Sequence, residues 1–174
     1  MVHQIAVYTD GSASTITRCG GYAAIVSLSA KETYILYGAE VDTTISRMEM
    51  MAVNAALDLV KTTIRERNML ERDIKVYCDS QFLVQCARGI FRRKANPDLW
   101  KRFEAVSVSG IEFIHIPRNS MPEQELCDGI AGKAREKAET EKASLPLKIK
   151  QVKHNENTSD SGLAAGSQEV PKDQ

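Results

Sequence analysis

The chain opens with an apolar run that ends in Val7-Tyr8-Thr9-Asp10-Gly11-Ser12, at positions 7–12. The alternation of side chains predicts a strand from Val2 to Thr9, with Ile5 and Val7 on one face. Asp10 follows this strand directly, although carboxylates are rarely placed against a core unless something compensates their charge. Taken alone, Asp10 fits a turn equally well, because Asp-Gly is a common turn signal.

Three more acidic residues have comparable positions. Asp79 ends a predicted strand, whereas Glu49 and Asp128 lie in apolar stretches that predict helices. Each has a structural alternative. Asp79 would suit a helix N-cap, and Glu49 would suit a capping box with Ser46. Asp128 would suit a solvated helix surface. If the fold gathers all four acids, their repulsion is severe, and a divalent metal is the usual remedy. Together they predict a metal-dependent enzyme with the composition of a two-magnesium site.

The overall composition is that of an ordinary globular protein. The 174 residues are 43% apolar and 26% charged, which suits one domain with a real core. The formal net charge is zero, so any affinity for nucleic acid must come from local patches. No apolar run reaches the length of a membrane span, and we expect neither a signal peptide nor a membrane partner. The four cysteines lack zinc-type spacing and indicate reduced thiols, so we expect a cytoplasmic protein. We also expect a monomer.

Periodicity predicts one α/β domain over residues 1–143, with a five-stranded mixed sheet. The expected elements, in order, are strands Val2–Thr9, Tyr22–Leu28 and Thr33–Ala39, a helix from the N-cap Ser46 to about Ile64, strand Ile74–Cys78, a short helix Gln81–Arg88, a helix that begins at Pro97, strand Ile111–Ile116 and a helix over about Glu123–Lys142. The second half of the last helix, 133–142, has few large apolar residues and is expected to be solvated. Residues 144–174 lack periodicity, which predicts a disordered polar tail.

Five short motifs occur between residue 1 and about residue 140. They are Tyr8-Thr9-Asp10-Gly11-Ser12; Thr43-Thr44 followed by Arg47-Met48-Glu49-Met50-Met51-Ala52; Tyr77-Cys78-Asp79-Ser80-Gln81; Asn96-x-Asp98-Leu99-Trp100-Lys101-Arg102; and Glu125-x-Cys127-Asp128-x-Ile130-Ala131. In this order the motifs resemble those of the type 1 ribonuclease H family. The resemblance implies a ribonuclease H-like fold, in which three antiparallel strands and then two parallel strands form a mixed sheet flanked by helices.

The resemblance also implies a reaction. The RNA strand of an RNA–DNA hybrid would be hydrolysed endonucleolytically to products with a 5′ phosphate and a 3′ hydroxyl. Two Mg²⁺ ions, with Mn²⁺ as a second candidate metal, would activate the attacking water and stabilise the leaving oxygen. The implied metal ligands and catalytic acids are Asp10, Glu49, Asp79 and Asp128, with Asp10 bridging both ions. Recognition of RNA requires contacts to 2′-hydroxyl groups, which the resemblance assigns to Gly11, Ser12, Glu49 and Gln81.

Two positions depart from the family pattern. Arg118 stands where the family commonly has a histidine in the loop before the last helix. Arginine stays charged and cannot shuttle a proton, yet it can donate hydrogen bonds to phosphate. We therefore expect an active enzyme in which Arg118 aids catalysis or product release; a solvated loop residue is the alternative. Ile45 stands where many relatives have an asparagine or glutamine that touches the minor groove, so we expect weaker hybrid affinity or a shifted substrate range.

Basic residues concentrate between Arg88 and Arg102 in this otherwise neutral chain. Within this stretch Arg92, Arg93 and Lys94 are candidates for contacts with phosphate, and a solvated helix face is the alternative.

Two other functions stay open at this point. One is a nuclease of the same fold that acts on double-stranded RNA or on DNA junctions. The other is a hybrid-binding module that kept the carboxylates but lost most of its turnover through Arg118 and Ile45. Magnesium-dependent cleavage of a hybrid would separate both from the leading interpretation.

Overall fold

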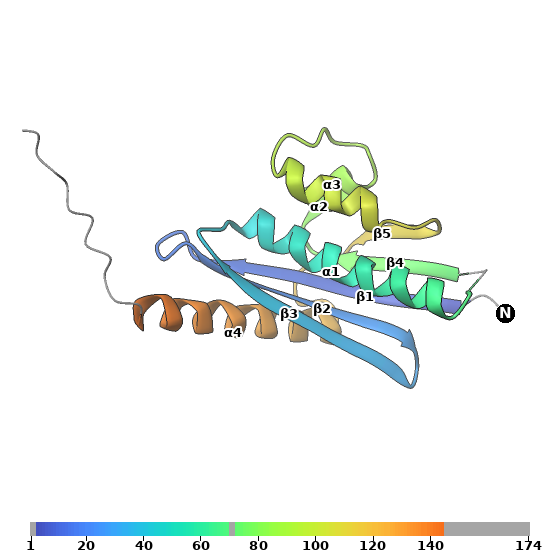
Figure 1. Ribbon diagram of the computed structural model, residues 1–174, viewed down its shortest axis with the longest axis horizontal. Helices are drawn as coiled ribbons and strands as arrows, with labels where there is room; N and C mark the ends of the chain where they lie inside the picture. Colours follow the sequence, from blue (N-terminus) through green and yellow to red (C-terminus); the bar gives the residue numbers. More distant parts are fainter. Residues whose placement is uncertain (1–2, 70–71, 145–174) are drawn as a thin grey trace, which may run out of the picture.

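Five strands form one mixed sheet in the spatial order β3-β2-β1-β4-β5 (Figure 1). Their bounds are β1 His3–Ala13, β2 Cys19–Ser29, β3 Glu32–Val41, β4 Arg72–Cys78 and β5 Ile111–His115. The structure, a computed structural model, describes residues 3–69 and 72–144. β1, β2 and β3 pair antiparallel, whereas β4 pairs parallel with both β1 and β5. The predicted mixed sheet is thereby confirmed.

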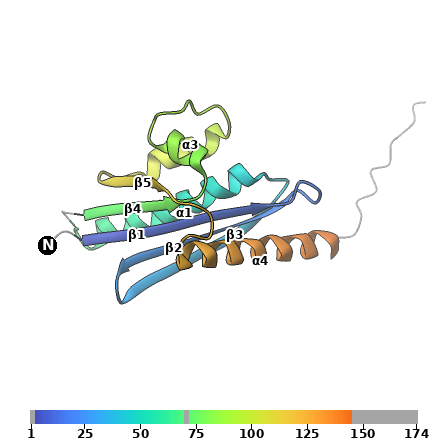
Figure 2. The ribbon, with the colours of Figure 1, turned by 180° about the vertical axis from the view of Figure 1, so that it is seen from behind.

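Three helices cover one face of the sheet, and a fourth covers the other face (Figures 1 and 2). They are α1 Ile45–Glu66, α2 Gln81–Ala87 and α3 Pro97–Val106 on the first face, and α4 Pro122–Ser144 on the second. None of these helices, which belong to the described ranges, is long and apolar enough to cross a membrane. The predicted tail lies outside the described residues, apart from Ser144, which ends α4.

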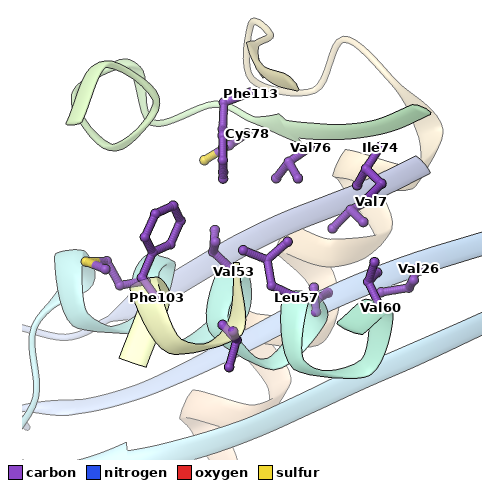
Figure 3. Packing of buried hydrophobic residues seen from close by; sticks show 14 of the residues in the cluster. Val7, Val26, Val53, Leu57, Val60, Ile74, Val76, Cys78, Phe103 and Phe113 are labelled. Atoms are coloured by element: carbon purple, nitrogen blue, oxygen red, sulfur yellow. The ribbon is translucent and has the colours of Figure 1, made fainter. Parts of the chain in front are cut away.

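The larger core lies between the sheet and α1 (Figure 3). Apolar side chains of β1, β2 and β4 meet those of α1 there, and all are almost fully buried: Val7, Val26, Val76, Val53, Leu57 and Val60. The α1 residues recur at spacings of three and four because only one side of a helix can face a sheet. Burial of each such side chain contributes about 1.5–3 kcal/mol, so this layer fixes α1 against the sheet.

β1 is longer than predicted. It continues through Asp10 and Gly11 to Ala13, and Asp10 lies opposite Ala23 of β2. Asp10 is therefore a strand residue, and its interpretation as a turn residue is wrong. The antiparallel partner satisfies the backbone across the Asp-Gly pair, and tertiary pairing of this kind overrides local turn preference.

α1 begins earlier than predicted, at Ile45. Its N-cap is Thr44, whose side-chain oxygen accepts a hydrogen bond from the backbone nitrogen of Arg47 at 3.4 Å. Ser46 lies inside the helix and accepts a hydrogen bond from the side chain of Asn96 at 3.2 Å. The predicted capping box of Ser46 with Glu49 is therefore wrong, and the position of Glu49 needs another explanation.

The second half of α4 is solvated on one side only, whereas the sequence predicts a solvated segment throughout. Ala138 is buried, and the side chains of Arg135 and Glu139 are about one quarter exposed. A Cβ atom on Gly21 of β2 would lie 2.3 Å from the carbonyl oxygen of Ala131 and 2.5 Å from the backbone nitrogen of Arg135. The helix thus rests on the sheet where only glycine fits. Small residues make this contact. The lack of large apolar side chains in this half of α4 therefore led to the incorrect prediction that the whole segment is solvated.

Candidate active site

Asp10 and Asp79 come side by side from neighbouring strands. β1 and β4 run parallel, and Thr9 lies opposite Cys78 in their register. In each of these two segments the next residue is an acid: Asp10 within β1, and Asp79 directly after β4. The alternative interpretation of Asp79 as the N-cap of the following helix is wrong, because the N-cap of α2 is Ser80. Parallel pairing therefore places two carboxylates at the same edge of the sheet.

α1 contributes Glu49 by an unusually close approach to the sheet. A Cβ atom on Gly11 would lie 2.4 Å from the backbone nitrogen of Glu49 and 2.7 Å from the carbonyl carbon of Met48. Gly20 leaves similar room, since a Cβ there would lie 2.7 Å from Cγ of Met48. From the sequence Gly11 is predicted only as a substrate contact, and nothing there singles out Gly20. Glycine inside a strand is a signal of close backbone approach.

α4 contributes Asp128 from the opposite face of the sheet. The side chain of Gln124, fully buried, donates to the carbonyl oxygen of Thr9 at 3.3 Å. The thiol of Cys127 donates to the carbonyl oxygen of Tyr8 at 3.4 Å. These bonds join α4 to β1 directly before Asp10, and Asp128 follows Cys127 in the helix. Gln124 is a positioning residue that no sequence pattern singled out.

Asp10 is the most perturbed of the four acids. It is 4% exposed; its Oδ1 accepts a hydrogen bond from the backbone nitrogen of Gly11 at 2.7 Å, while its Oδ2 is buried without a hydrogen-bond partner among the described residues. Burial, followed by the charge of Asp79, raises the pKa of Asp10 to about 7, and the charge of Asp128 adds to the effect. The bond from Gly11 and the charge of Arg118 oppose this shift without cancelling it.

Glu49 shares the same electrostatic surroundings. Burial raises the pKa of Glu49, a hydrogen bond with the Ser80 side chain lowers it, and the negative charge of Asp79 raises it further. The pairwise repulsions therefore link Glu49 to Asp79, Asp79 to Asp10, and Asp10 to Asp128. The fold brings together all four carboxylates that the sequence singled out.

Arg118 faces this cluster from the connection between β5 and α4. Its Nη2 lies 2.5 Å from Oδ1 of Asp128, in an ion pair whose side chains are 67% and 39% exposed. The hydrogen bond and charge of Asp128, with smaller contributions from Asp10 and Asp79, raise the pKa of the Arg118 guanidinium. Arg118 therefore lies at the site, where it pairs with Asp128 and interacts with the charges of Asp10 and Asp79.

The donor atoms fit a divalent cation. Carboxylate oxygens are the ligands that Mg²⁺ and Mn²⁺ prefer, and the unpartnered Oδ2 of Asp10 has an open coordination position among other negative charges. As placed, no three histidine, cysteine or acidic side chains in the described part of the chain form a ready metal-binding group. Asp128 is engaged by Arg118 instead. The donor chemistry of these side chains therefore suits a divalent metal ion.

The candidate phosphate contacts differ in their surroundings. Arg92 and Lys94 are exposed in the connection between α2 and α3. Arg93 lies 4.2 Å above the ring of Trp100, donates to the carbonyl oxygen of Cys86 at 3.2 Å, and pairs with Glu104 at 3.0 Å. The guanidinium of Arg93 therefore serves packing within the protein. Ser12 is half-buried and Gln81 is exposed beside Ser80 at the start of α2.

An exposed aromatic pair adjoins these basic residues. The rings of Phe82 and Phe91 lie 6.0 Å apart, and the two residues are 57% and 47% exposed. The sequence does not predict this exposed pair, because a phenylalanine within the apolar stretch of α2 would be expected to be buried.

Comparison with known proteins places the chain in a family. The RNase H family profile matches residues 2–136. Ribonuclease HI of Helicobacter pylori (strain ATCC 700392 / 26695) is 34% identical over 141 residues, which cover 75% of this chain and 92% of that protein. Ribonuclease H of Sulfurovum sp. (strain NBC37-1) is 32% identical over 153 residues, 82% of this chain and 95% of that protein.

Solved structures agree in fold. LC11-RNase H1 in complex with an RNA/DNA hybrid superposes with a TM-score of 0.65 at 23% identity, covering 77% of this chain and 98% of that one. The N-terminal RNase H domain of rv2228c from Mycobacterium tuberculosis, solved as a fusion with maltose binding protein, also gives 0.65, at 21% identity and with 82% and 99% covered. The chain belongs to the type 1 ribonuclease H family.

Proposed function

We propose that the protein is an endoribonuclease that cleaves the RNA strand of RNA–DNA hybrids with the help of divalent metal ions. The observation that carries this proposal is the buried Asp10, whose side chain, with Oδ2 unpartnered, interacts with the charges of Asp79 and Asp128 where β1 and β4 meet. Glu49 joins the group through its interaction with Asp79. A solved relative of the same fold binds an RNA/DNA hybrid, which supports the choice of substrate.

The four acids would hold the metal ions in the proposed reaction, with Asp10 at the centre of the group. The backbone N–H of Gly11 holds one oxygen of Asp10 and leaves the other for a cation. Glu49, Asp79 and Asp128 would complete the set of ligands that holds the metal. Bound Mg²⁺ or Mn²⁺ supplies activation of the attacking water and stabilisation of the leaving oxygen. Water attacks phosphorus in line with the departing 3′ oxygen, so that a new P–O bond forms as the P–O3′ bond breaks. The attacking water gives up a proton and the 3′ oxygen takes one up from solvent, which gives one product with a 5′ phosphate and one with a 3′ hydroxyl.

Arg118 has a role that its position makes testable. A guanidinium beside three carboxylates can release Asp128 and donate to the scissile phosphate or to the product's 5′ phosphate. Arg118→Ala is expected to slow cleavage by about 10- to 100-fold, the value of one hydrogen bond to a charged group. Single-turnover and steady-state rates measured together would separate chemistry from product release. Lys137→Ala, at an exposed position of α4, is the control; an Arg118→Ala variant as fast as the parent would remove Arg118 from the mechanism.

The proposal is tested with labelled substrates presented side by side. The purified protein is incubated with an RNA–DNA hybrid, an RNA duplex, a DNA duplex and a DNA junction, each with Mg²⁺, with Mn²⁺ and with chelator. Metal-dependent cuts confined to the RNA of the hybrid support the proposal. Cleavage of the RNA duplex or the junction alone would point to a same-fold nuclease with another substrate. Tight hybrid binding without cleavage in either metal would point to a catalytically weakened binding module.

A further inference from the structure

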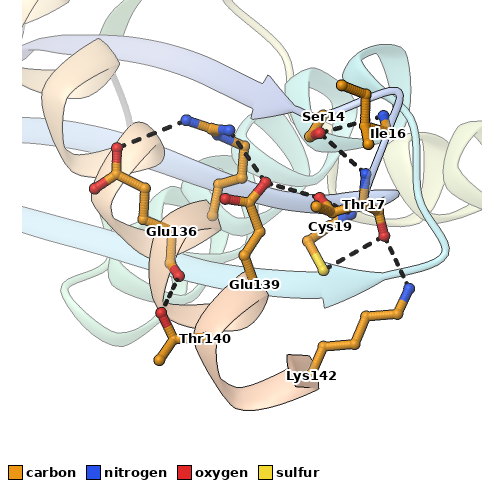
Figure 4. Close-up of polar contacts among 9 residues, drawn as sticks. Ser14, Ile16, Thr17, Cys19, Glu136, Glu139, Thr140 and Lys142 are labelled. Carbon is orange, nitrogen blue, oxygen red and sulfur yellow. Dashed lines mark hydrogen bonds and ion pairs between the residues drawn. The ribbon is translucent and has the colours of Figure 1, made fainter. Parts of the chain in front are cut away.

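The distal half of α4, residues 133–144, holds the hairpin that joins β1 to β2 (Figure 4). The hydroxyl of Thr17 donates to Oε1 of Glu139 at 2.7 Å, and Nζ of Lys142 donates to the carbonyl oxygen of Thr17 at 2.9 Å. These contacts join residues more than 120 positions apart in the chain. One hairpin residue is therefore held at both its side chain and its backbone.

Lys142 also reaches a second segment, the connection between β3 and α1. Its Nζ lies 3.6 Å from Oδ1 of Asp42, and Asp42 pairs with Arg18 of the hairpin at 3.5 Å. The backbone nitrogen of Thr43 donates to the carbonyl oxygen of Arg18 at 3.0 Å. A single lysine on α4 thus links the hairpin to the segment that leads into α1.

The two linked segments form opposite walls of a pocket of about 290 Å³. Its lining residues are Ala13, Ser14, Thr15 and Arg18 from the hairpin side, and Thr43, Thr44 and Ile45 from the other side. The hairpin wall continues directly into Ser12 and Gly11, which adjoin Asp10. The opposite wall continues into α1, which carries Glu49. Both sides of this pocket are therefore continuous along the chain with residues of the proposed active site.

The backbone at both walls requires support. Arg18 and Asp42 adopt left-handed conformations, with φ of 56° and 55°, which are sparsely populated by residues other than glycine. Such conformations persist only where surrounding contacts hold them. At Arg18 those contacts are backbone hydrogen bonds, from its own nitrogen to the carbonyl oxygen of Ser14 at 2.9 Å and from Thr43 to its carbonyl oxygen at 3.0 Å. At Asp42 they are the ion pairs with Arg18 and with Lys142 of α4. α4 is anchored in turn, since Glu139 pairs with Arg135 at 3.2 Å and Arg135 packs through its backbone on Gly21.

We propose that Glu139 and Lys142 are positioning residues that fix the spacing between the hairpin and the segment 42–45, and thereby set how tightly the hybrid is bound. This inference rests on the proposed function, since the hairpin matters only if Gly11 and Ser12 contact substrate. The two residues do not touch the reacting atoms. Their removal therefore changes substrate binding and leaves the chemical step in place.

The test compares Glu139→Ala, Lys142→Ala and the double variant with the parent enzyme. The double variant is expected to raise KM for a hybrid by about three- to tenfold, with kcat within about twofold, because three partly exposed polar contacts to the hairpin and to segment 42–45 are lost. Amide hydrogen exchange within residues 14–18 is expected to accelerate in the same variant. Glu139→Gln keeps an acceptor for the Thr17 hydroxyl and should restore most of the parent KM.

Lys137→Ala is the matched control. Lys137 also lies in the distal half of α4, but its side chain is exposed and its ion pair, with Glu141 at 3.9 Å, stays within the helix. An active double variant with the parent's KM and unchanged exchange in 14–18 would overturn the positioning role. A fall in kcat in step with a loss of folded protein would also overturn it, since that result indicates a purely structural contact. A parent enzyme that leaves hybrids intact would instead refute the proposed function.

Discussion

Asp10→Asn is expected to abolish hybrid cleavage and, at the same time, to stabilise the metal-free protein at neutral to alkaline pH. The loss of cleavage follows from removing the central carboxylate of the site. The gain in stability follows from linkage. Asp10 has a pKa of about 7 in the folded chain against an ordinary 3.8, so its proton is held more tightly in the folded state. The stability that this proton supplies is complete below pH 3.8 and is lost as the pH rises through about 7.

The size of this effect makes it measurable. Above the folded-state pKa, the charged Asp10 destabilises the metal-free protein by up to about 4 kcal/mol, and asparagine removes that charge without changing the shape of the side chain. Urea unfolding in chelator at about pH 5 and about pH 9 should show the variant gaining stability over the parent mainly at the higher pH. Asp73→Asn is the control, since Asp73 is a half-exposed β4 residue paired with Lys75. Persistent Mg²⁺-dependent cleavage by Asp10→Asn would refute the proposed site.

Gly11→Ala is expected to have the second large effect, because a single added methyl group separates α1 from the sheet. The new Cβ would lie 2.4 Å from the backbone nitrogen of Glu49, a contact that only a shift of the helix backbone can relieve. Overpacking of this kind costs about 1–3 kcal/mol in stability. Displacement of Glu49 by an ångström would reduce kcat by at least about 100-fold, because catalytic geometry tolerates little error.

Gly132→Ala separates this effect from the general cost of replacing a glycine. Gly132 lies in α4, and an added Cβ there meets nothing within 4 Å. Alanine is the better helix former, so this variant should gain about 0.5–1 kcal/mol and keep the parent kcat. Both variants are compared by thermal unfolding and by steady-state cleavage of a hybrid. A Gly11→Ala enzyme with the parent's kcat would show that close approach of α1 is not needed at the site.

Local periodicity was enough to predict which segments become strands and helices. Val7 and Val76 belong to strands because their neighbours alternate or are uniformly apolar, and Val53 and Leu57 belong to a helix because apolar residues recur every three or four positions. The motifs around the four acids were also legible in the chain itself. The ends of elements were less predictable. Asp10-Gly11 has the local preference of a turn, and only its pairing with β2 keeps it in the strand.

The sequence by itself determined the element order, the family and the identity of the four carboxylates, since these depend on residue type and short spacing. Only the tertiary structure decided that Asp10 is buried with one oxygen unpartnered, that Arg118 pairs with Asp128, and that the end of α4 holds Thr17. Each of these depends on surfaces that meet only after folding. Burial, charge coupling and hydrogen bonds across 122 positions leave no periodic trace, because they arise from packing between elements and not within one.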